Sequence, residues 1–331
     1  MSELRQDPIT HDWVIINPDR AKRPDDKAAT SSVCPFCPGN EHLTPEPVDC
    51  WMDGDRWSVR VVPNKFPALA PQQQGARIVD APPGWRRLPG YGYHEVIIDS
   101  PDHELSFGAL PEPHVRKIVA MYLRRYRALS QADGMRQVVL FRNHGRRAGT
   151  SLLHPHSQIV AAPVVAPKIR WRLSEEIEFF DATGGCGLCH VLENELRLGS
   201  RVVYANKRFV TFAPYASRVP YHVQIVPRRH CASFAEMDPA EGDELAGHLR
   251  RVLDVFIRRL HDPDYNLIVV TPPLDQVHRL ANHWFIELLP RTTTTAGFEL
   301  GSRIVVNIQT PEQAAAELRE SAPDNRTGET P

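Results

Sequence analysis

The feature that most constrains the fold of this 331-residue chain is a Cys-x-x-Cys pair that occurs twice, each time followed by two widely spaced histidines. The two sets are Cys34, Cys37, His103 and His154, and Cys186, Cys189, His230 and His283. The two histidines of a set are separated by nearly the same number of residues in both. Because matched order and matched spacing rarely arise by chance, the sequence predicts a tandem duplication of one structural unit.

The segments between these landmarks predict the same order of elements in each half. Short segments rich in Val, Ile and Phe that end at Pro, Asn or Asp predict strands. These segments are 57–63, 94–100, 137–143, 157–163, 209–214, 222–227, 266–272 and 283–290. Apolar residues at a period of 3.6 predict helices over 111–131 and 239–261, and Pro311 begins a shorter helix. The sequence therefore predicts an α+β fold of antiparallel sheets with packed helices.

We expect the duplication to divide the chain into residues 1–170 and residues 171–320, with the seam near 165–185. Residues 321–331 are polar and predict a flexible tail, and residues 20–33 predict a polar loop. The chain has 30 prolines, about 9% of its residues against an average near 5%. This proline content favours turns and loops over a helical bundle.

Composition excludes several classes of protein. Lys and Arg number 39 and Asp and Glu 40, so a formal charge of -1 argues against a nucleic-acid partner held by a basic surface. No apolar segment approaches the roughly 20 residues that a membrane span needs. The first residues, MSELRQDPITHDW, contain no apolar signal segment, so we expect a cytoplasmic location.

In a reducing compartment, paired thiols at this spacing indicate metal ligands before disulfides. Two Cys and two His form a closed tetrahedral set that suits Zn²⁺, and with no open coordination position the zinc would be structural. The alternative is a pair of buried free thiols with unrelated histidines, which the repeat makes less favoured. In the second set His190 and Cys231 are neighbours that could replace a ligand. One zinc site is therefore predicted, and the second is left open.

The segment HPHSQ, residues 154–158, opens one of the predicted strands. Alternate residues of a strand share a face, so His154, His156 and Gln158 would point the same way. If zinc fixes His154, then His156 has a rigid neighbour, and a neutral imidazole held in place can attack phosphorus. Gln158 and the Gly- and Arg-rich segment 141–151 would bind phosphate oxygens. The alternative roles of His156 are a second metal ligand and a core histidine.

The second half provides an internal comparison for this segment. When the last histidines of the two sets are aligned, Phe285 falls opposite His156, and Glu287 falls opposite Gln158. The second half thus keeps the ligand position and lacks the candidate nucleophile. This predicts that only the first half is chemically competent. The other ring nitrogen of His156 needs an acceptor that fixes the tautomer, and we expect a backbone carbonyl.

In these motifs the chain resembles the galactose-1-phosphate uridylyltransferase family of the histidine-triad superfamily. RAKRP, CPFCPGN, PNKFPAL, SPDH, FRNHG and HPHSQ occur in the family's order, and the resemblance extends from RAKRP at 20–24 to GFEL at 297–300. It implies a tandem histidine-triad fold, usually a homodimer, that acts on a nucleotide sugar and a hexose 1-phosphate. In the implied double displacement, His156 takes UMP from UDP-glucose, releases glucose 1-phosphate and passes the UMP to galactose 1-phosphate.

The same resemblance implies roles for further residues. His156 matches the nucleophile, and the set that contains Cys34 matches the family's zinc ligands. The positions that match substrate contacts are Arg20, Arg23, Asn64, Asn143, Ser151, Gln158 and Glu299. Glu299, in GFEL, matches a hexose-binding glutamate that the partner subunit often supplies.

The chain departs from the best-known branch of the family at several of these motifs. Ser157 stands where that branch has Gly, and Glu287 and Leu289 stand where it has a His-x-His for a further metal, so that metal is expected to be absent. HPHSQ, PNKFPAL and GFEL are more similar to the branch that includes a plant ADP-glucose phosphorylase, which has a second zinc like the set that contains Cys186.

Three hypotheses for function follow, in order of preference. The first is a hexose-1-phosphate uridylyltransferase. The second is a nucleoside-diphosphate-hexose phosphorylase, in which inorganic phosphate accepts the nucleotide from the same histidine. The third is a zinc-containing nucleotide-binding protein without turnover.

Overall fold

The computed structural model describes residues 2–22, 33–71 and 84–321, and its largest element is a sheet of ten strands among these residues. The strands are β3 (Asp49–Asp53), β4 (Arg56–Pro63), β6 (Tyr93–Ile98), β7 (Gln137–His144), β8 (His156–Ala162), β9 (Val202–Ala205), β10 (Phe209–Phe212), β11 (Val223–Pro227), β12 (Tyr265–Val270) and β13 (Phe285–Pro290). A separate small sheet contains β1 (Glu3–Gln6), β2 (Trp13–Ile16) and β5 (Arg86–Pro89).

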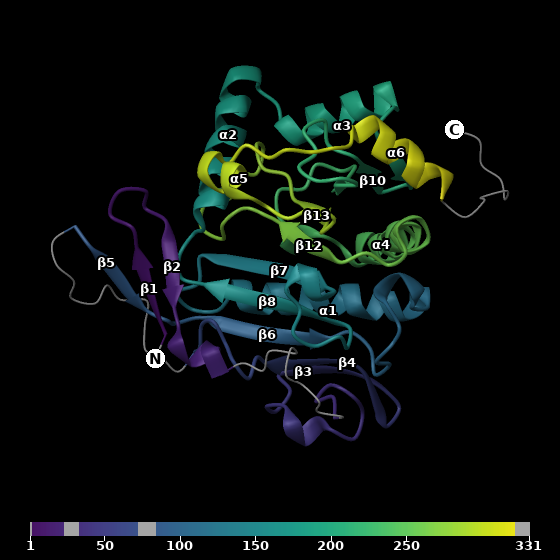
Figure 1. Ribbon diagram of the computed structural model, residues 1–331. Coiled ribbons are helices and arrows are strands. Elements are labelled where there is room, and N and C mark those ends of the chain that lie inside the picture. Colours follow the sequence, from purple (N-terminus) through teal and green to yellow (C-terminus); the bar gives the residue numbers. More distant parts are fainter. Residues whose placement is uncertain (1, 23–32, 72–83, 322–331) are drawn as a thin grey trace.

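The order of strands across the large sheet has an approximate two-fold symmetry (Figure 1). It runs β3-β4-β6-β8-β7 through the first half and continues as β12-β13-β11-β10-β9 through the second. Each strand of one half thus has a counterpart at the mirrored place in the other. Strands β7 and β12 pair antiparallel at the centre, so the two halves share one continuous sheet.

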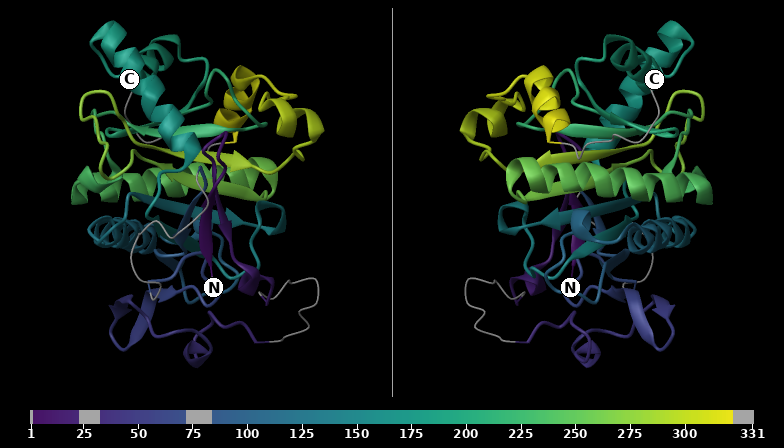
Figure 2. Two further views of the ribbon diagram at one scale, coloured as in Figure 1. Left: turned by 90° about the vertical axis from the view of Figure 1, so that its left-hand side faces the viewer. Right: turned by 90° about the vertical axis from the view of Figure 1, so that its right-hand side faces the viewer.

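Helices cover both faces of this sheet. They are α1 (Glu112–Ser130), α2 (Pro167–Thr183), α3 (Gly187–Leu198), α4 (Pro239–Leu260), α5 (Gly297–Ser302) and α6 (Pro311–Glu320). α1 and α4 run side by side over one face (Figure 2). On strand β8, Ile159 and Ala161 pack into the core cluster beneath these two helices. Because strand residues alternate between faces, His156 and Gln158 lie on the opposite face.

The opposite face is covered differently in the two halves. Over the second half, α2 and α3 pack on an apolar cluster that includes Phe285 and Leu188. Over the first half, Phe36 packs with Val96 and Ile98, so the segment around the first Cys-x-x-Cys pair covers this part of the sheet. The face that carries His156 is therefore next to the first Cys/His set.

The predicted α+β fold and the tandem duplication are confirmed, and each of the eight predicted strands and three predicted helices has its counterpart within two residues at either end. The small sheet, β3, β9, α2, α3 and α5 were not predicted. α2 occupies the segment expected to be the seam, and its low amphipathicity explains why the apolar period did not reveal it. Arg23 and the end of the expected tail lie outside the described residues. No described helix is long and apolar enough to span a membrane.

Candidate active site and metal centres

The first Cys/His set comes together in the structure as the repeat predicted. The donor atoms of Cys34, Cys37, His103 and His154 all lie within 4.8 Å of one another. Cys37 Sγ lies 3.3 Å from His103 Nδ1 and 3.6 Å from His154 Nδ1, and the two Nδ1 atoms are 3.3 Å apart. The Nε2 of His154 donates to the Ser100 carbonyl at 2.8 Å, which directs Nδ1 towards the sulfur atoms.

The second set forms an equivalent cluster, again with all donor atoms within 4.8 Å. Cys189 Sγ lies 3.3 Å from both His230 Nδ1 and His283 Nδ1. The Nε2 of His230 lies 2.7 Å from a backbone carbonyl, that of Arg279, so this ring is also oriented by its far nitrogen. His190 and Cys231, the alternative ligands that the sequence left open, are outside the cluster.

Both clusters fit a tetrahedral metal ion with two sulfur and two nitrogen ligands. Bond lengths of about 2.3 Å to sulfur and about 2.0 Å to nitrogen place such donors roughly 3.5 Å apart. The sulfur-to-nitrogen separations in the two clusters are 3.3–3.9 Å. Either set of four side chains could therefore hold a metal ion. In each set, protein side chains would fill all four coordination positions.

His156 begins strand β8, and its side chain is 6% exposed. Its Nδ1 lies 2.8 Å from the backbone carbonyl of His154, two residues earlier. A carbonyl can only accept, so Nδ1 carries the proton and Nε2 holds the lone pair. The ring of Phe36 lies edge-on to the imidazoles of both His154 and His156. The expected carbonyl partner is thus confirmed, and the residue that provides it belongs to the first Cys/His cluster.

Gln158 follows on the same face of β8 and contacts the neighbouring strand β6. Its Oε1 lies 2.9 Å from Nε2 of the buried His94. Asn64 lies beside this pair, with its Nδ2 3.1 Å from His94 Nε2. The structure thus brings together Gln158 and Asn64, two predicted substrate-binding residues, through His94, which sequence reasoning missed.

Asn143 lies near the end of β7. When the β7–β8 register is extended by two residues, Asn143 falls opposite His156. Asn266 of β12 is its partner on the other side and donates to Asn143 Oδ1 at 2.8 Å. The loop after Asn143 is also held from the second half, since Asp264 accepts from the backbone N–H of Arg147. The second half therefore supports the predicted phosphate loop of the first.

A buried ion pair lies directly beneath His156, on the face of the sheet that α1 covers. Arg142 and Asp99 form this pair, and both side chains are almost fully buried. The hydroxyl of Ser157 lies 3.3 Å from both carboxylate oxygens of Asp99 and also contacts the hydroxyl of Tyr122. The Arg142 guanidinium lies 3.4 Å from the carbonyl of His156. This network therefore contacts the backbone of the candidate nucleophile.

The charge states of Arg142 and Asp99 depend on each other. Burial acts to lower the pKa of Arg142, but the adjacent Asp99 carboxylate outweighs burial and raises it. For Asp99, burial is the largest effect and raises its pKa, while Arg142 acts to lower it. Since arginine stays charged in proteins, we take the pair as ionised while both partners are present.

Sequence reasoning missed this ion pair, because its residues align with their counterparts only once the strand registers are known. Matching the registers of β8 and β13 aligns Arg142, Ser157 and Asp99 with apolar counterparts. Those counterparts are Val269, Ile286 and Pro227. A comparison of the two halves therefore reveals three polar residues at core positions, and only in the half that contains His156.

Glu287, the counterpart of Gln158, is enclosed by cations. It forms ion pairs with Arg218 at 2.7 Å and with Lys168 at 3.6 Å, and its carboxylate lies 3.3 Å from His222. Burial acts to raise its pKa, but these partners outweigh burial and hold the pKa of Glu287 at about 2. The guanidinium of Arg172 lies over the ring of Phe285 at 4.4 Å. α2 thus covers the second-half counterpart of the candidate site.

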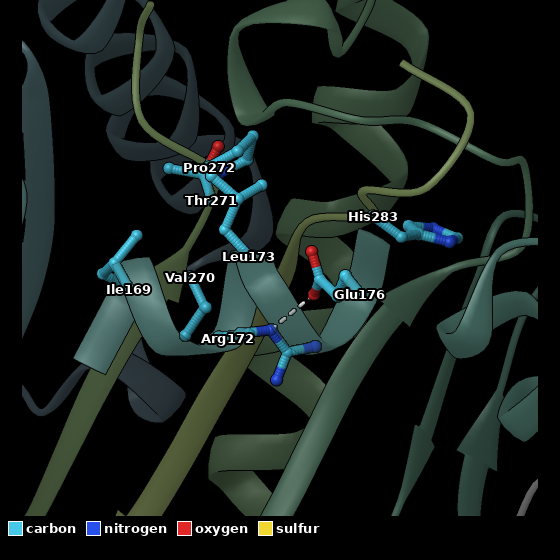
Figure 3. Close-up of a pocket in the computed structure, with 8 residues that line it drawn as sticks. All are labelled: Ile169, Arg172, Leu173, Glu176, Val270, Thr271, Pro272 and His283. Atoms are coloured by element: carbon cyan, nitrogen blue, oxygen red, sulfur yellow. Dashed lines mark hydrogen bonds and ion pairs between the residues drawn. The ribbon is translucent and has the colours of Figure 1, made fainter. Parts of the chain in front are cut away.

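A cavity beneath α2 is too small for a nucleotide. It has room for about one water molecule. In Figure 3 Arg172 and Glu176 bond to each other in its wall, while the His283 ring points away from them. We therefore assign this cavity no part in substrate binding.

The remaining predicted contacts are more dispersed. Arg20 is half-buried in a short turn, where its N–H donates to the carbonyl of Asn17, and the Asn17 side chain bonds to Pro67 O in the PNKFPAL segment. Ser151 is half-buried in the loop before β8. Glu299 caps the N-terminus of α5, in the second half, and no described contact joins it to the residues around His156 (Figure 1).

Comparisons with known proteins agree with this geometry. The family model described as galactose-1-phosphate uridyl transferase, N-terminal domain, matches residues 1–166. ADP-glucose phosphorylase of Arabidopsis thaliana is 33% identical over 96% of this chain and 92% of its own length. Galactose-1-phosphate uridylyltransferase of Thermotoga maritima is 30% identical over 97% of this chain and 99% of its own. The Arabidopsis crystal structure with bound ADP-glucose has a TM-score of 0.78 and covers 97% of this chain and 99% of that one. The chain therefore belongs to the galactose-1-phosphate uridylyltransferase family.

Proposed function

We propose that the chain is a UDP-glucose–hexose-1-phosphate uridylyltransferase that forms a covalent nucleotidyl intermediate on His156. The observation that carries this proposal is the 2.8 Å contact between His156 Nδ1 and the carbonyl of His154. That contact leaves Nε2 with its lone pair, the state that a nucleophilic imidazole needs. Because His154 is itself part of a metal cluster, the orientation of the nucleophile is fixed to a rigid part of the fold.

The reaction would proceed in two displacements at phosphorus. His156 Nε2 forms a bond to the α-phosphorus of the nucleotide sugar, and the bond to the bridging oxygen breaks, which releases the sugar 1-phosphate. A phosphate oxygen of galactose 1-phosphate then attacks the same phosphorus and frees the imidazole. Asn143, Gln158 and Ser151 would bind phosphate oxygens, Arg20 and Arg23 the nucleotide sugar, Asn64 the nucleoside and Glu299 the hexose. Catalysis by these groups would rest on positioning and charge.

An ADP-glucose phosphorylase is the second candidate, and a specific finding favours it. The Arabidopsis relative is 33% identical to the chain, against 30% for the Thermotoga uridylyltransferase. In that reaction inorganic phosphate, rather than a hexose 1-phosphate, would receive the nucleotide from His156. The two candidates therefore share the nucleophile and differ in nucleobase and acceptor.

Intact mass separates these candidates. We expect the protein to gain the mass of UMP after incubation with UDP-glucose and to lose it again when galactose 1-phosphate is added. Gain of AMP from ADP-glucose, discharged by inorganic phosphate, would instead support the phosphorylase. If neither nucleotide sugar leaves an adduct, the covalent mechanism is wrong, and a nucleotide-binding protein without turnover becomes the preferred hypothesis.

We propose Zn²⁺ as the metal of both Cys/His sets, since thiolate and imidazole ligands in a tetrahedral arrangement favour it. When bound, the zinc would supply rigidity and no open coordination position. Metal analysis should find two zinc ions in each chain, and Cys189→Ala should retain one. Because metal binding contributes to folding, we expect that variant to melt roughly 10 °C lower.

Cys231→Ala is the matched control for this zinc experiment. Cys231 is buried one residue from His230, and its thiol contacts the Ser233 carbonyl rather than the cluster. This variant should keep both zinc ions. A loss of zinc from Cys231→Ala, or two zinc ions retained in Cys189→Ala, would mean that the ligand set is wrong.

We propose that the protein acts as a cytoplasmic homodimer on small molecules, with no nucleic-acid partner. The support for a dimer is a group of exposed apolar side chains close to Glu299 in sequence. They are Phe298, Leu300, Ile304, Val305, Val306 and Ile308. Contiguous exposed apolar surface is typical of association sites. In a dimer this surface would bring Glu299 of one subunit towards the site of the other.

A further inference from the structure

Two amide side chains on the face of His156, Gln158 and Asn143, are each held by their oxygen atoms. Gln158 Oε1 contacts His94 Nε2 at 2.9 Å, and Asn143 Oδ1 contacts Asn266 Nδ2 at 2.8 Å. An amide can present either its oxygen or its NH₂ group to a ligand. Only the NH₂ end stabilises a phosphate oxygen, so what fixes the orientation of these amides also decides whether they assist the reaction.

For Gln158 the orientation of the amide follows from a backbone N–H, which can only donate a hydrogen bond. The Ala68 N–H donates to His94 Nδ1 at 3.0 Å, so in the neutral ring the proton is on Nε2. The Nε2–H therefore donates to Gln158 Oε1 and leaves the NH₂ of Gln158 directed elsewhere. Asn64 Nδ2 lies 3.1 Å from the same Nε2, but it is also a donor, since Asn64 Oδ1 accepts from the Phe66 N–H.

For Asn143 the orientation also follows from a backbone group. Asn266 Nδ2 donates to the Ala148 carbonyl at 2.9 Å as well as to Asn143 Oδ1. Because a carbonyl accepts only, the end of Asn266 that faces both partners must be its NH₂. Asn143 consequently turns its oxygen to Asn266, and its own NH₂ points away from that partner. Among the described residues, neither NH₂ group, of Asn143 or of Gln158, has a recorded hydrogen-bond partner.

We call each of these chains, from a backbone group through a side chain to an amide, a relay. The second half has a similar series of contacts through a histidine, but its last step is an ion-pair contact and not a hydrogen bond. The Arg218 N–H contacts His222 Nδ1 at 3.2 Å, and His222 Nε2 lies 3.3 Å from Glu287. His222 and Glu287 occupy the strand positions that match His94 and Gln158. There the relay ends on a carboxylate enclosed by Arg218 and Lys168, with no donor left over. Only the half that contains His156 ends the relay on an amide.

We propose that His94 and Asn266 are positioning residues that orient the NH₂ groups of Gln158 and Asn143 towards phosphate oxygens of a nucleotide bound at His156. The inference rests on the proposed function, because it takes the ligand to be a nucleotide phosphate. β6 and β12 lie on either side of the β8–β7 pair, so the two relays approach the candidate nucleophile from opposite sides (Figure 1). Donors fixed before the reaction stabilise charge on the phosphate without reorganisation.

The rate of adduct formation at saturating nucleotide sugar tests the relay. With UDP-glucose or ADP-glucose, whichever labels the unmodified protein, we expect His94→Phe to lower this rate about 10- to 100-fold, with KM changed less than about 3-fold. His94→Gln keeps a donor and an acceptor and should restore most of the rate. In a Gln158→Ala background, His94→Phe should cause little further loss, because its effect passes through Gln158.

Matched variants keep this test decisive if His94→Phe folds poorly. His222→Phe makes the same change at the matched position of the second half, and its adduct rate should stay within about 3-fold. Asn266→Ala removes the other relay at a partly exposed position and should slow the adduct about 10-fold. Equal losses from His94→Phe with and without Gln158, or no loss from Asn266→Ala, would overturn the proposal. Absence of an adduct in the unmodified protein would instead contradict the proposed function.

In that last case the relay can still be tested with ADP and UDP as probes. We expect either nucleotide to shift the side-chain NH₂ resonances of Gln158 and Asn143 in a ¹⁵N–¹H spectrum. His94→Phe should remove the shift at Gln158 and leave that at Asn143. Shifts that do not respond to His94→Phe would overturn the relay independently of turnover.

Discussion

His156→Ala should abolish the nucleotidyl adduct and lower turnover by on the order of 10⁴-fold or more, the largest effect expected of any single change in this protein. The side chain is the only candidate nucleophile that the described residues of this face place beside the first Cys/His cluster. No neighbour can replace it, because His154 directs its Nδ1 to the cluster and its Nε2 to a carbonyl. Intact mass measures the adduct, and a coupled assay of released sugar 1-phosphate measures turnover.

Phe285→Leu is the matched control for His156→Ala. Phe285 lies at the same strand position in the second half and is also buried, so both changes remove a buried ring. We expect Phe285→Leu to lower the melting temperature by a few degrees and to leave the adduct intact. An adduct that persists in His156→Ala would show that another residue is the nucleophile, and peptide mapping of the adduct would locate it.

The two Cys/His sets and the order of elements along each half could be predicted because they leave direct signals in the sequence. Cysteine and histidine at fixed spacing indicate a metal site whatever lies between them, and the repeat gives each predicted ligand a counterpart in the other half. The strands that carry His156 and Phe285 are buried on both faces, and apolar residues make up most of each, so their strand character does not depend on knowing which face is buried.

The relays through His94 and Asn266 and the Arg142–Asp99 ion pair could not be predicted from such sequence signals. His94 and Asn266 act through side-chain orientations that are set by the backbone of Ala68 and Ala148, and no spacing rule connects those segments. Asp99 directly follows β6 and Arg142 lies in β7, and both strands contain further polar residues such as Glu95 and Asn143. Until the strand pairing is known, the sequence therefore does not distinguish a charged residue in the core from one at an edge or a strand end. Only the alignment of the two halves in the sheet shows that both are at core positions.

The placement of α2 has a similar explanation. It packs on the second half, where this face carries Phe285 and Glu287. Lys168 and Arg172 therefore have a role only once the sheet has assembled. A helix that depends on such tertiary contacts shows a weak apolar period in its own sequence.

Asp99→Leu should be the most destabilising single change in the core of the first half, by about 3–5 kcal/mol, because it leaves the Arg142 guanidinium buried without a partner. Arg142→Met should cost less, since the Asp99 carboxyl can take up a proton. Burial raises the pKa of Asp99, and removing Arg142 removes the opposing effect. A folded-state pKa above the unfolded value favours the folded state at low pH, so Arg142→Met should lose stability as the pH rises from the unfolded-state pKa of Asp99 through its folded-state pKa. Urea unfolding at pH 5 and pH 8 measures both effects.

The double variant Asp99→Leu/Arg142→Met separates stability from positioning. It replaces the pair with apolar side chains, as the second half does with Pro227 and Val269, so most of the stability lost in Asp99→Leu should return. We nevertheless expect its adduct rate to stay about 10-fold or more below that of the unmodified protein, because the pair contacts Ser157 and the carbonyl of His156. Full recovery of both stability and rate would mean that the pair has no role in positioning His156. Recovery of stability alone would mean that the first half keeps a costly buried charge because it fixes the backbone of the nucleophile.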